Sequence, residues 1–314
     1  MIQMPQHKMS IQNHTINNNH AAKLVPFTFS CHSIACERHP ERNEDSVLVD
    51  EQSGLVAVFD GVGGSAAGEI ASRTAAQATH QGWKHILREI QNKRRIHSIL
   101  ETSETLNICT IIELIIQQAD ELVRTEGAQR AGTDDLATTI ALATICRQPK
   151  SRDYKMVYAH VGDSRIYLLR NNKSLERLTS DDGLLAKLVE NKIVDQAGAL
   201  RIDQAMYAHQ LTDTEYNYFR LRGGITQALG GPIAPTIHTD EVIITPGDRI
   251  LLCTDGIHDN LTDGEIEAIL RDGPRTTAAR LLVEQSLERS HQDRSTTIRA
   301  KPDDMSATVV TCRF

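Results

Sequence analysis

Three apolar runs in this chain lead directly into an aspartate, and an acidic pair stands just before the last apolar run. The runs and their carboxylates are residues 55–59 before Asp60, 156–161 before Asp163, 250–254 before Asp255, and Asp303 and Asp304 before 307–310. Carboxylates at the ends of separate strands can converge at one rim of a sheet. Two of them about 4 Å apart would repel by about 4 kcal/mol at an effective dielectric constant of about 20. Because Mg2+ and Mn2+ prefer oxygen ligands and relieve such repulsion, the pattern indicates a divalent metal site.

The elements that must position these carboxylates are predicted from the spacing of apolar residues. Long helices are expected at 66–87, with Ser65 available as its N-cap, and at 99–123. The shorter predicted elements are helices at 183–191, 263–270 and 276–289 and strands at 138–146, 154–169, 242–244 and 250–254. Strands, a helix pair, more strands and more helices, without strict βαβ alternation, predict an α+β fold.

The chain is predicted to consist of a tail and one domain. Residues 1–24 are rich in Asn, Gln and His and are expected to be disordered. Scattered tail histidines (His7, His14 and His20) are more simply explained as solvated than as metal ligands. Residues 25–314 form the predicted domain, in which Leu200 to Gly224 has mixed polarity without a clear period and is interpreted as a surface flap.

Composition argues against several classes of protein. The net charge is -7, from 34 basic and 41 acidic residues, and no basic stripe with interleaved aromatic residues favours nucleic-acid binding. The six cysteines lack a CxxC pair, which is typical of reduced thiols. The sequence begins without a charged and then apolar leader, and its most apolar stretch, residues 108–116, is interrupted by Thr110 and Glu113. The expectation is a soluble cytoplasmic protein with no membrane span.

Two other kinds of active site were weighed. Gly61 to Ala66 fits the dinucleotide-binding pattern GxGxxA, but Asp60 would place a charge beside the pyrophosphate. The second strand with an acidic end about 20 residues later, which would bind the ribose, is also missing. A serine hydrolase could use Ser164, but the GxSxG motif is absent and no histidine stands at a distinctive position.

Eight short motifs occur in the order and rough spacing found in the PP2C-like (PPM) metal-dependent protein phosphatases, which this chain resembles from about residue 30 to its end. The motifs are Asn-Glu-Asp-Ser at 43–46, Phe-Asp-Gly-Val-Gly-Gly at 59–64, Gly-Thr at 132–133, Val-Gly-Asp-Ser-Arg at 161–165, Leu-Thr-Ser-Asp at 178–181, Ile-Thr-Gln-Ala-Leu-Gly at 225–230, Cys-Thr-Asp-Gly-Ile-His-Asp at 253–259, and Asp-Asp-Met-Ser at 303–306. Each motif alone is weak, but eight in series are specific.

The resemblance implies a β-sandwich of two antiparallel sheets flanked by helices, with two Mn2+ or Mg2+ ions at one end. It implies that Asp60 bridges both ions, with Asp255 and Asp303 on the second ion. The remaining implied contributors are the Gly61 carbonyl as a further ligand, Glu44 through a water, Asp45 as a supporting neighbour, and Asp163 and Asp259, with Asp255, around a weaker third ion. The two ions would activate a bridging hydroxide that hydrolyses phosphoserine or phosphothreonine in proteins.

The sequence departs from many relatives at three positions. Pro40 stands where they have a phosphate-binding arginine, and Arg38 or Arg42 is close enough to replace it, although alternate residues of a strand face opposite sides. Val62 replaces a histidine that is a candidate general acid, for which His258 is a speculative substitute. Asp304 replaces an asparagine and adds negative charge.

Simpler interpretations remain open for single residues. Asp60 and Asp255 each precede a glycine, as in many turns, Asp163 could pair with Arg165, and Asp259 could begin a helix. For the whole chain, the first hypothesis is a monomeric cytoplasmic phosphatase that opposes a serine/threonine kinase. The alternative is a catalytically weak pseudophosphatase that binds phosphoproteins as a regulatory module.

Overall fold

A computed structural model describes residues 26–62, 67–97, 107–126, 136–148 and 153–313. The predicted tail at 1–24, the Gly-Thr motif at 132–133, the glycines at 63 and 64, the Ser65 cap and the start of the predicted helix at 99–106 lie outside these residues.

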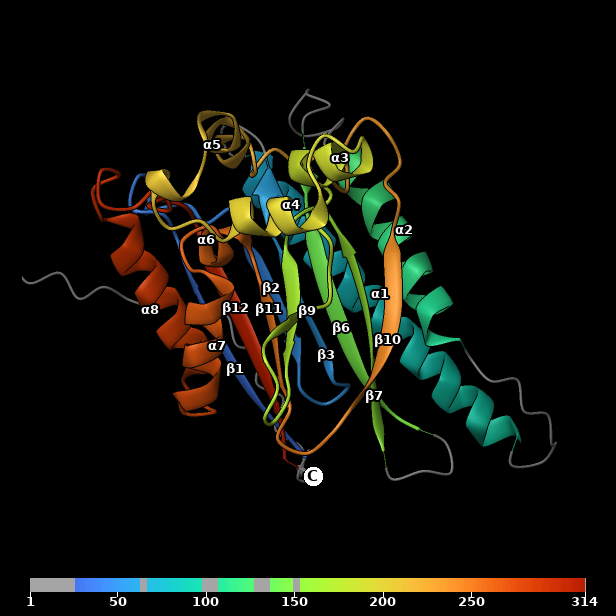
Figure 1. Ribbon diagram of the computed structural model, residues 1–314. Coiled ribbons are helices and arrows are strands. Elements are labelled where there is room, and N and C mark those ends of the chain that lie inside the picture. The colour runs from blue at the N-terminus through green and yellow to red at the C-terminus, as the bar shows by residue number, and fades with distance from the viewer. Residues whose placement is uncertain (1–25, 63–66, 98–106, 127–135, 149–152, 314) are drawn as a thin grey trace, which may run out of the picture.

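Two five-stranded antiparallel sheets stack on each other, and a third sheet has two short strands (Figure 1). Sheet A has the order β1 (Phe27–Ile34), β12 (Met305–Cys312), β11 (Arg249–Cys253), β8 (Arg165–Leu169) and β9 (Glu176–Arg177). Sheet B has the order β10 (His238–Ile244), β7 (Tyr154–Val161), β6 (Ile140–Arg147), β3 (Leu55–Phe59) and β2 (Ser46–Asp50). The small sheet pairs β4 (Gly61–Val62) with β5 (Ala137–Thr138).

Helices cover the outer face of each sheet, so the central strands are buried on both faces (Figure 1). Sheet B packs on α1 (Ala67–His97) and α2 (Ile108–Glu126), and sheet A packs on α7 (Asp263–Asp272) and α8 (Ala278–Ser290). Along β3, Val56 and Val58 enter the core between the sheets, whereas Leu55, Ala57 and Phe59 enter the core under the helices. This alternation follows from the two-residue period of a strand. The α+β sandwich flanked by helices is therefore confirmed.

One predicted strand is in fact two. The apolar run at 154–169 breaks at Gly162, so that β7 belongs to sheet B and β8 to sheet A. Gly162 has a φ of 96°, and a Cβ atom there would lie 2.6 Å from Cγ2 of Thr139, so only glycine fits this crossing. As a result, Asp163 lies where the chain passes between the two sheets.

The segment between β9 and β10 forms short helices at one end of the sandwich, at the top of Figure 1. They are α3 (Leu184–Glu190), α4 (Gln196–Asp203), the 3-10 helix η2 (Ala208–Gln210) and α5 (Asp213–Arg220). The predicted flap at 200–224 thus contains the end of α4, η2 and α5. A capping box between Thr212 and Glu215 begins α5. In the described part of the chain, no helix is both long and apolar enough to cross a membrane.

Candidate metal centre

Asp60 is held at the end of β3 by sheet-like hydrogen bonds. Its N–H donates to Oγ1 of Thr139 at 3.1 Å, and the Thr139 N–H donates to the Asp60 carbonyl at 2.8 Å. Because Leu55 to Phe59 are all buried, β3 is a firm support for the carboxylate that follows it. Asp60 therefore has a fixed place at the rim of sheet B.

The other strand-end carboxylates come to the same rim from sheet A. Asp163 lies just before β8, Asp255 begins the short helix α6 (Asp255–His258) after β11, and Asp303 lies just before β12. Burial raises the pKa of Asp60 well above its ordinary value. The negative charges of four other residues raise it further, in decreasing order Asp255, Asp45, Asp303 and Asp163. The contacts of neighbouring residues agree: Oγ1 of Thr139, which accepts the Asp60 N–H, lies 2.8 Å from Oγ of Ser164, the residue after Asp163. The predicted convergence of the strand ends is present in the structure.

Two further acidic residues come from the loop before β2. Asp45 is buried and accepts a hydrogen bond from Oγ1 of Thr254 at 2.8 Å, which ties this loop to the residue before Asp255. Burial raises the pKa of Asp45 well above its ordinary value, and burial also raises that of Glu44. Oε1 of Glu44 is buried without a hydrogen-bond partner among the described residues. This oxygen forms an ion pair with Nε of Arg42 at 3.3 Å but accepts no hydrogen bond in this part of the chain.

Glycines bring the backbone of the rim close to α1. A Cβ atom on Gly61 would lie 2.2 Å from the Gly68 carbonyl oxygen and 2.5 Å from that of Glu44. A Cβ atom on Gly68 would lie 2.7 Å from the Gly61 carbonyl oxygen. Among the described residues, the rim therefore offers oxygen ligands from carboxylates and from a closely packed carbonyl, and this set of ligands fits hard divalent cations.

Lys301 provides a cation within this acidic rim that sequence reasoning missed. Its Nζ lies 2.5 Å from Oδ2 of Asp255, 2.8 Å from Oδ2 of Asp259 and 3.0 Å from Oδ2 of Asp303. Burial would lower the pKa of Lys301, but these three carboxylates outweigh it and raise the pKa well above its ordinary value. The lysine is thus held charged between two of the predicted second-ion ligands and Asp259.

Asp259 differs from the other acidic residues because two cations already compensate it. Besides Lys301, Nε of Arg222 lies 3.1 Å from its Oδ1. Burial would raise the pKa of Asp259, but Arg222 and Lys301 outweigh it and lower the pKa well below its ordinary value. Asp163, in contrast, has a pKa raised well above its ordinary value by burial and by the Asp255 charge. It does not pair with Arg165, whose guanidinium binds Asp181 and Asp203 at 2.6 and 2.8 Å.

The geometry separates the two candidate phosphate-binding arginines. Residues 35–45 form no strand but contain a turn at 37–41, with the N–H groups of His39 and Arg42 bonded to the carbonyls of Cys36 and His39. The strand alternation assumed from the sequence therefore does not apply. Nε of Arg42 lies 3.3 Å from Oε1 of Glu44, whereas Arg38 is exposed. Arg42 is the one that reaches the rim.

Asp304, which departs from the pattern of the relatives, and His258, the speculative proton donor, are both buried. Asp304 is buried and accepts the N–H groups of Cys36 and Glu44 at 2.6 Å each, so it fixes the loop that carries Glu44. His258 is buried with Nε2 3.0 Å from the Asp163 carbonyl oxygen, and burial, together with the Arg165 charge, lowers its pKa to about 4. A neutral, buried imidazole does not suit the speculative role of proton donor.

A further cluster beside the rim contains His160, Asp182 and His238, whose candidate ligand atoms lie within 4.8 Å of one another. The two imidazole rings are stacked at 4.8 Å, and Nε2 of His238 contacts Oδ1 of Asp182 at 3.0 Å. Asp182 also accepts the N–H of Gly162 and a side-chain N–H of Gln227. These contacts tie the crossing between the sheets to the segment before β10.

Comparisons with known proteins agree with this arrangement. The family model described as "Protein phosphatase 2C" matches residues 35–289. The chain is 27% identical over 235 residues to the serine/threonine phosphatase stp of Listeria welshimeri, covering 74% of this chain and 79% of the relative. It is 29% identical over 218 residues to the protein phosphatase PhpP of Streptococcus pneumoniae, covering 69% of this chain and 72% of the relative.

Solved structures share the fold. The serine/threonine phosphatase PstP/Ppp of Mycobacterium tuberculosis superposes with a TM-score of 0.66 at 22% identity, over 92% of this chain and 99% of that one. A catalytic domain of PstP in complex with two manganese ions superposes with a TM-score of 0.62 at 23% identity, over 91% of this chain and 97% of that one. With the family model covering most of its length and acidic strand ends meeting at one rim, this chain belongs to the protein phosphatase 2C family.

Proposed function

We propose that this chain is a Mn2+- or Mg2+-dependent phosphatase that hydrolyses phosphoserine and phosphothreonine in proteins. The observation that carries the proposal is that acidic residues from separate strand ends meet at one rim, where Lys301 contacts both Asp255 and Asp303 and the Thr254 hydroxyl binds Asp45. The charges of Asp255, Asp45 and Asp303 also raise the pKa of Asp60. The serine/threonine phosphatase stp among its relatives supports the substrate class. Monomeric action in the cytoplasm against a serine/threonine kinase remains a prediction.

The residues that would hold two ions are Asp60 between them, the Gly61 carbonyl and Glu44 on one side, and Asp255 and Asp303 on the other, with Asp45 supporting the loop. When bound, the ions would lower the pKa of a water molecule and neutralise phosphate oxygens. We propose two ions rather than three, because the positive charges of Lys301 and Arg222 already compensate the Asp259 carboxylate. Asp163 and Asp259 would then shape the rim without holding a third ion.

Arg42 would bind the phosphate dianion and orient it for in-line attack by water on phosphorus. A guanidinium is suited to this because its planar N–H groups match the oxygens of a phosphate. As water adds, the bond from phosphorus to the serine or threonine oxygen breaks, and that oxygen must take up a proton. Val62 cannot donate one and His258 is buried, so we propose that the proton comes from water at the rim.

The direct test is release of phosphate from a phosphoserine peptide with added Mn2+, compared between the native chain and Asp60→Asn. Turnover that needs Mn2+ and is lost in Asp60→Asn supports the proposal. Metal-independent turnover, or full turnover by Asp60→Asn, contradicts it.

The pseudophosphatase alternative is favoured by one specific observation. The Lys301 ammonium lies between Asp255 and Asp303, so a lysine can compensate part of the acidic rim without metal. In that case calorimetric titration with Mn2+ would give no heat while a phosphopeptide still bound. Tight Mn2+ binding together with turnover would exclude this alternative.

A further inference from the structure

A pocket of about 190 Å³ lies at the end of sheet A opposite the acidic rim. Leu169, Arg249 and Thr311 form a row across β8, β11 and β12 and line this pocket. The row next to the rim, with Arg165, Cys253 and Ala307, is four residues further along the strands. At about 3.4 Å per residue, roughly 14 Å of strand separates the two rows.

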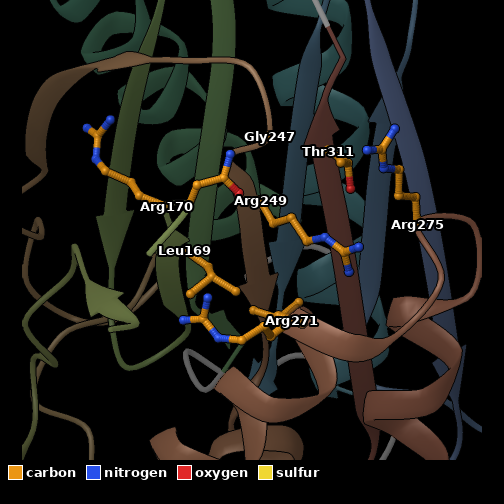
Figure 2. A pocket seen from close by; sticks show the side chains of 9 residues that line it. Leu169, Arg170, Gly247, Arg249, Arg271, Arg275 and Thr311 are labelled. Atoms are coloured by element: carbon orange, nitrogen blue, oxygen red, sulfur yellow. The ribbon is translucent and has the colours of Figure 1, made fainter. Parts of the chain in front are cut away.

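Four arginines line the pocket, from different parts of the chain: Arg170, Arg249, Arg271 and Arg275 (Figure 2). Two of them are paired with carboxylates. Arg170 lies 3.2 Å from Asp248, and Arg271 lies 2.6 Å from Glu267. The four positive charges at one site are notable in a chain with a net charge of -7.

The other two arginines have no carboxylate partner within the described residues. Nη1 of Arg249 donates to the Gly273 carbonyl at 2.8 Å, and Arg275 is exposed in the turn between α7 and α8. Burial lowers the pKa of Arg249, and the Arg275 charge lowers it further. Two guanidinium groups that repel each other in this way are stabilised by an anion placed between them.

Thr311 adds a neutral donor to the same place. It is 1% exposed, and its hydroxyl is buried with no hydrogen-bond partner in the part of the chain that the structure describes. Figure 2 shows the guanidinium groups of Arg249 and Arg275 near Thr311, while the side chain of Arg170 extends away from them. A hydroxyl and two guanidinium groups can donate to several oxygens of one phosphate.

We propose that this arginine pocket is a second binding site, for a phosphoryl dianion, separate from the acidic rim. The shared chemistry is a phosphate with two negative charges, either free in solution or esterified to serine in a peptide. The pocket suits a single phosphoryl group rather than a polyanion, because its volume is small and the chain as a whole is acidic. The proposal is independent of catalysis and would hold for an inactive protein.

The test is calorimetric titration of the full chain in excess chelator with inorganic phosphate and, separately, with a phosphoserine peptide. Without divalent ions the acidic rim repels phosphate and no turnover occurs, so binding reports on the arginine pocket. The test variants are Arg275→Gln, which removes one charge at an exposed position, and Thr311→Val, which removes only the hydroxyl. The matched control is Arg280→Gln, since Arg280 is also exposed but pairs with Glu284 outside the pocket.

We expect Arg275→Gln to weaken phosphate binding about tenfold, Thr311→Val about threefold, and Arg280→Gln by less than twofold. Binding of both ligands with the same affinity identifies free phosphate as sufficient, and binding of the peptide alone identifies an esterified phosphate. Binding of neither ligand overturns the proposal. Equal binding by the native chain and Arg275→Gln, or an equal loss in Arg280→Gln, also overturns it.

Discussion

The two ends of sheet A carry opposite charges that are each incompletely compensated. At one end, carboxylates after β11 and before β8 and β12 crowd together with Lys301 among them. At the other end, Arg249 and Arg275 have no carboxylate partner within the described residues. The same strands place the carboxylates, Arg249 and Thr311, whereas Arg275 comes from the turn between α7 and α8. We propose that the first end binds cations and the second an anion. One set of strands can therefore position incompletely compensated charges at two separate sites, one at each end of the sheet.

The largest expected effect is on catalysis at the acidic end. Asp60→Asn should lower Mn2+-dependent phosphopeptide hydrolysis by at least about 100-fold, because it removes the carboxylate that we propose holds both ions. Steady-state rates measure this effect. Asp240→Asn, on the edge strand β10, is the matched control and should retain activity.

The acidic end should also destabilise the metal-free protein as the pH rises. The pKa of Asp60 is higher in the folded protein than in the unfolded chain, so the protonated form of Asp60 favours folding. This contribution to the free energy of unfolding is lost as the pH rises from about 3.9, the pKa of an unfolded aspartate, through the raised pKa of the folded protein. In chelator, Asp60→Asn should therefore match the native chain near pH 4 and exceed its stability by about 1 to 3 kcal/mol near pH 7.5. Denaturant unfolding at both pH values measures the difference. A constant difference would contradict the repulsion.

Substitution of Lys301 tests whether this lysine competes with metal ions for the carboxylates at the acidic end. Lys301→Met should tighten Mn2+ binding about tenfold, because it removes a cation that competes for Asp255 and Asp303. Asp259→Asn should leave the number of bound ions at two. Calorimetric titration measures both, with Lys155→Met as a control at another lysine paired with a carboxylate. A third ion that disappears in Asp259→Asn would show that Asp259 is a ligand.

Substitution of the two candidate phosphate-binding arginines should have a smaller effect on hydrolysis. Arg42→Ala should raise the KM for a phosphopeptide about fivefold, since it removes a charge-assisted contact beside Glu44. Arg38→Ala should leave KM unchanged, because the Arg38 side chain is exposed and forms no ion pair within the described residues. Equal effects of the two substitutions would contradict the choice of Arg42 and would indicate that the turn at 37–41 rearranges when substrate binds.

The smallest effect is expected from the basic end on catalysis. Arg275→Gln should change hydrolysis of a small aryl phosphate by less than about twofold, because about 14 Å of strand lies between the two ends. A large loss of kcat in this variant would show that the two ends are coupled.

The sequence predicted what local patterns determine. Apolar runs that end in aspartate identified β3 and β11 within one residue, because burial on both faces leaves a continuous hydrophobic run. The pattern did not show that 154–169 changes sheets, since Gly162 interrupts the run by its φ of 96° rather than by its polarity. It also missed Lys301, the pairing of Arg165, and the arginine pocket. Long-range charge partners leave no periodic signal in a sequence.

The central claim is that Asp60, Asp255 and Asp303 share a pair of divalent ions. Anomalous diffraction from a crystal of the native chain soaked in Mn2+ tests it most directly. We expect two anomalous peaks, both within ligand distance of Asp60, with one also in contact with Asp255 and Asp303. A soak at saturating Mn2+ that gives no peak beside Asp60, while Lys301 keeps its contacts with the carboxylates, would contradict the shared pair of ions.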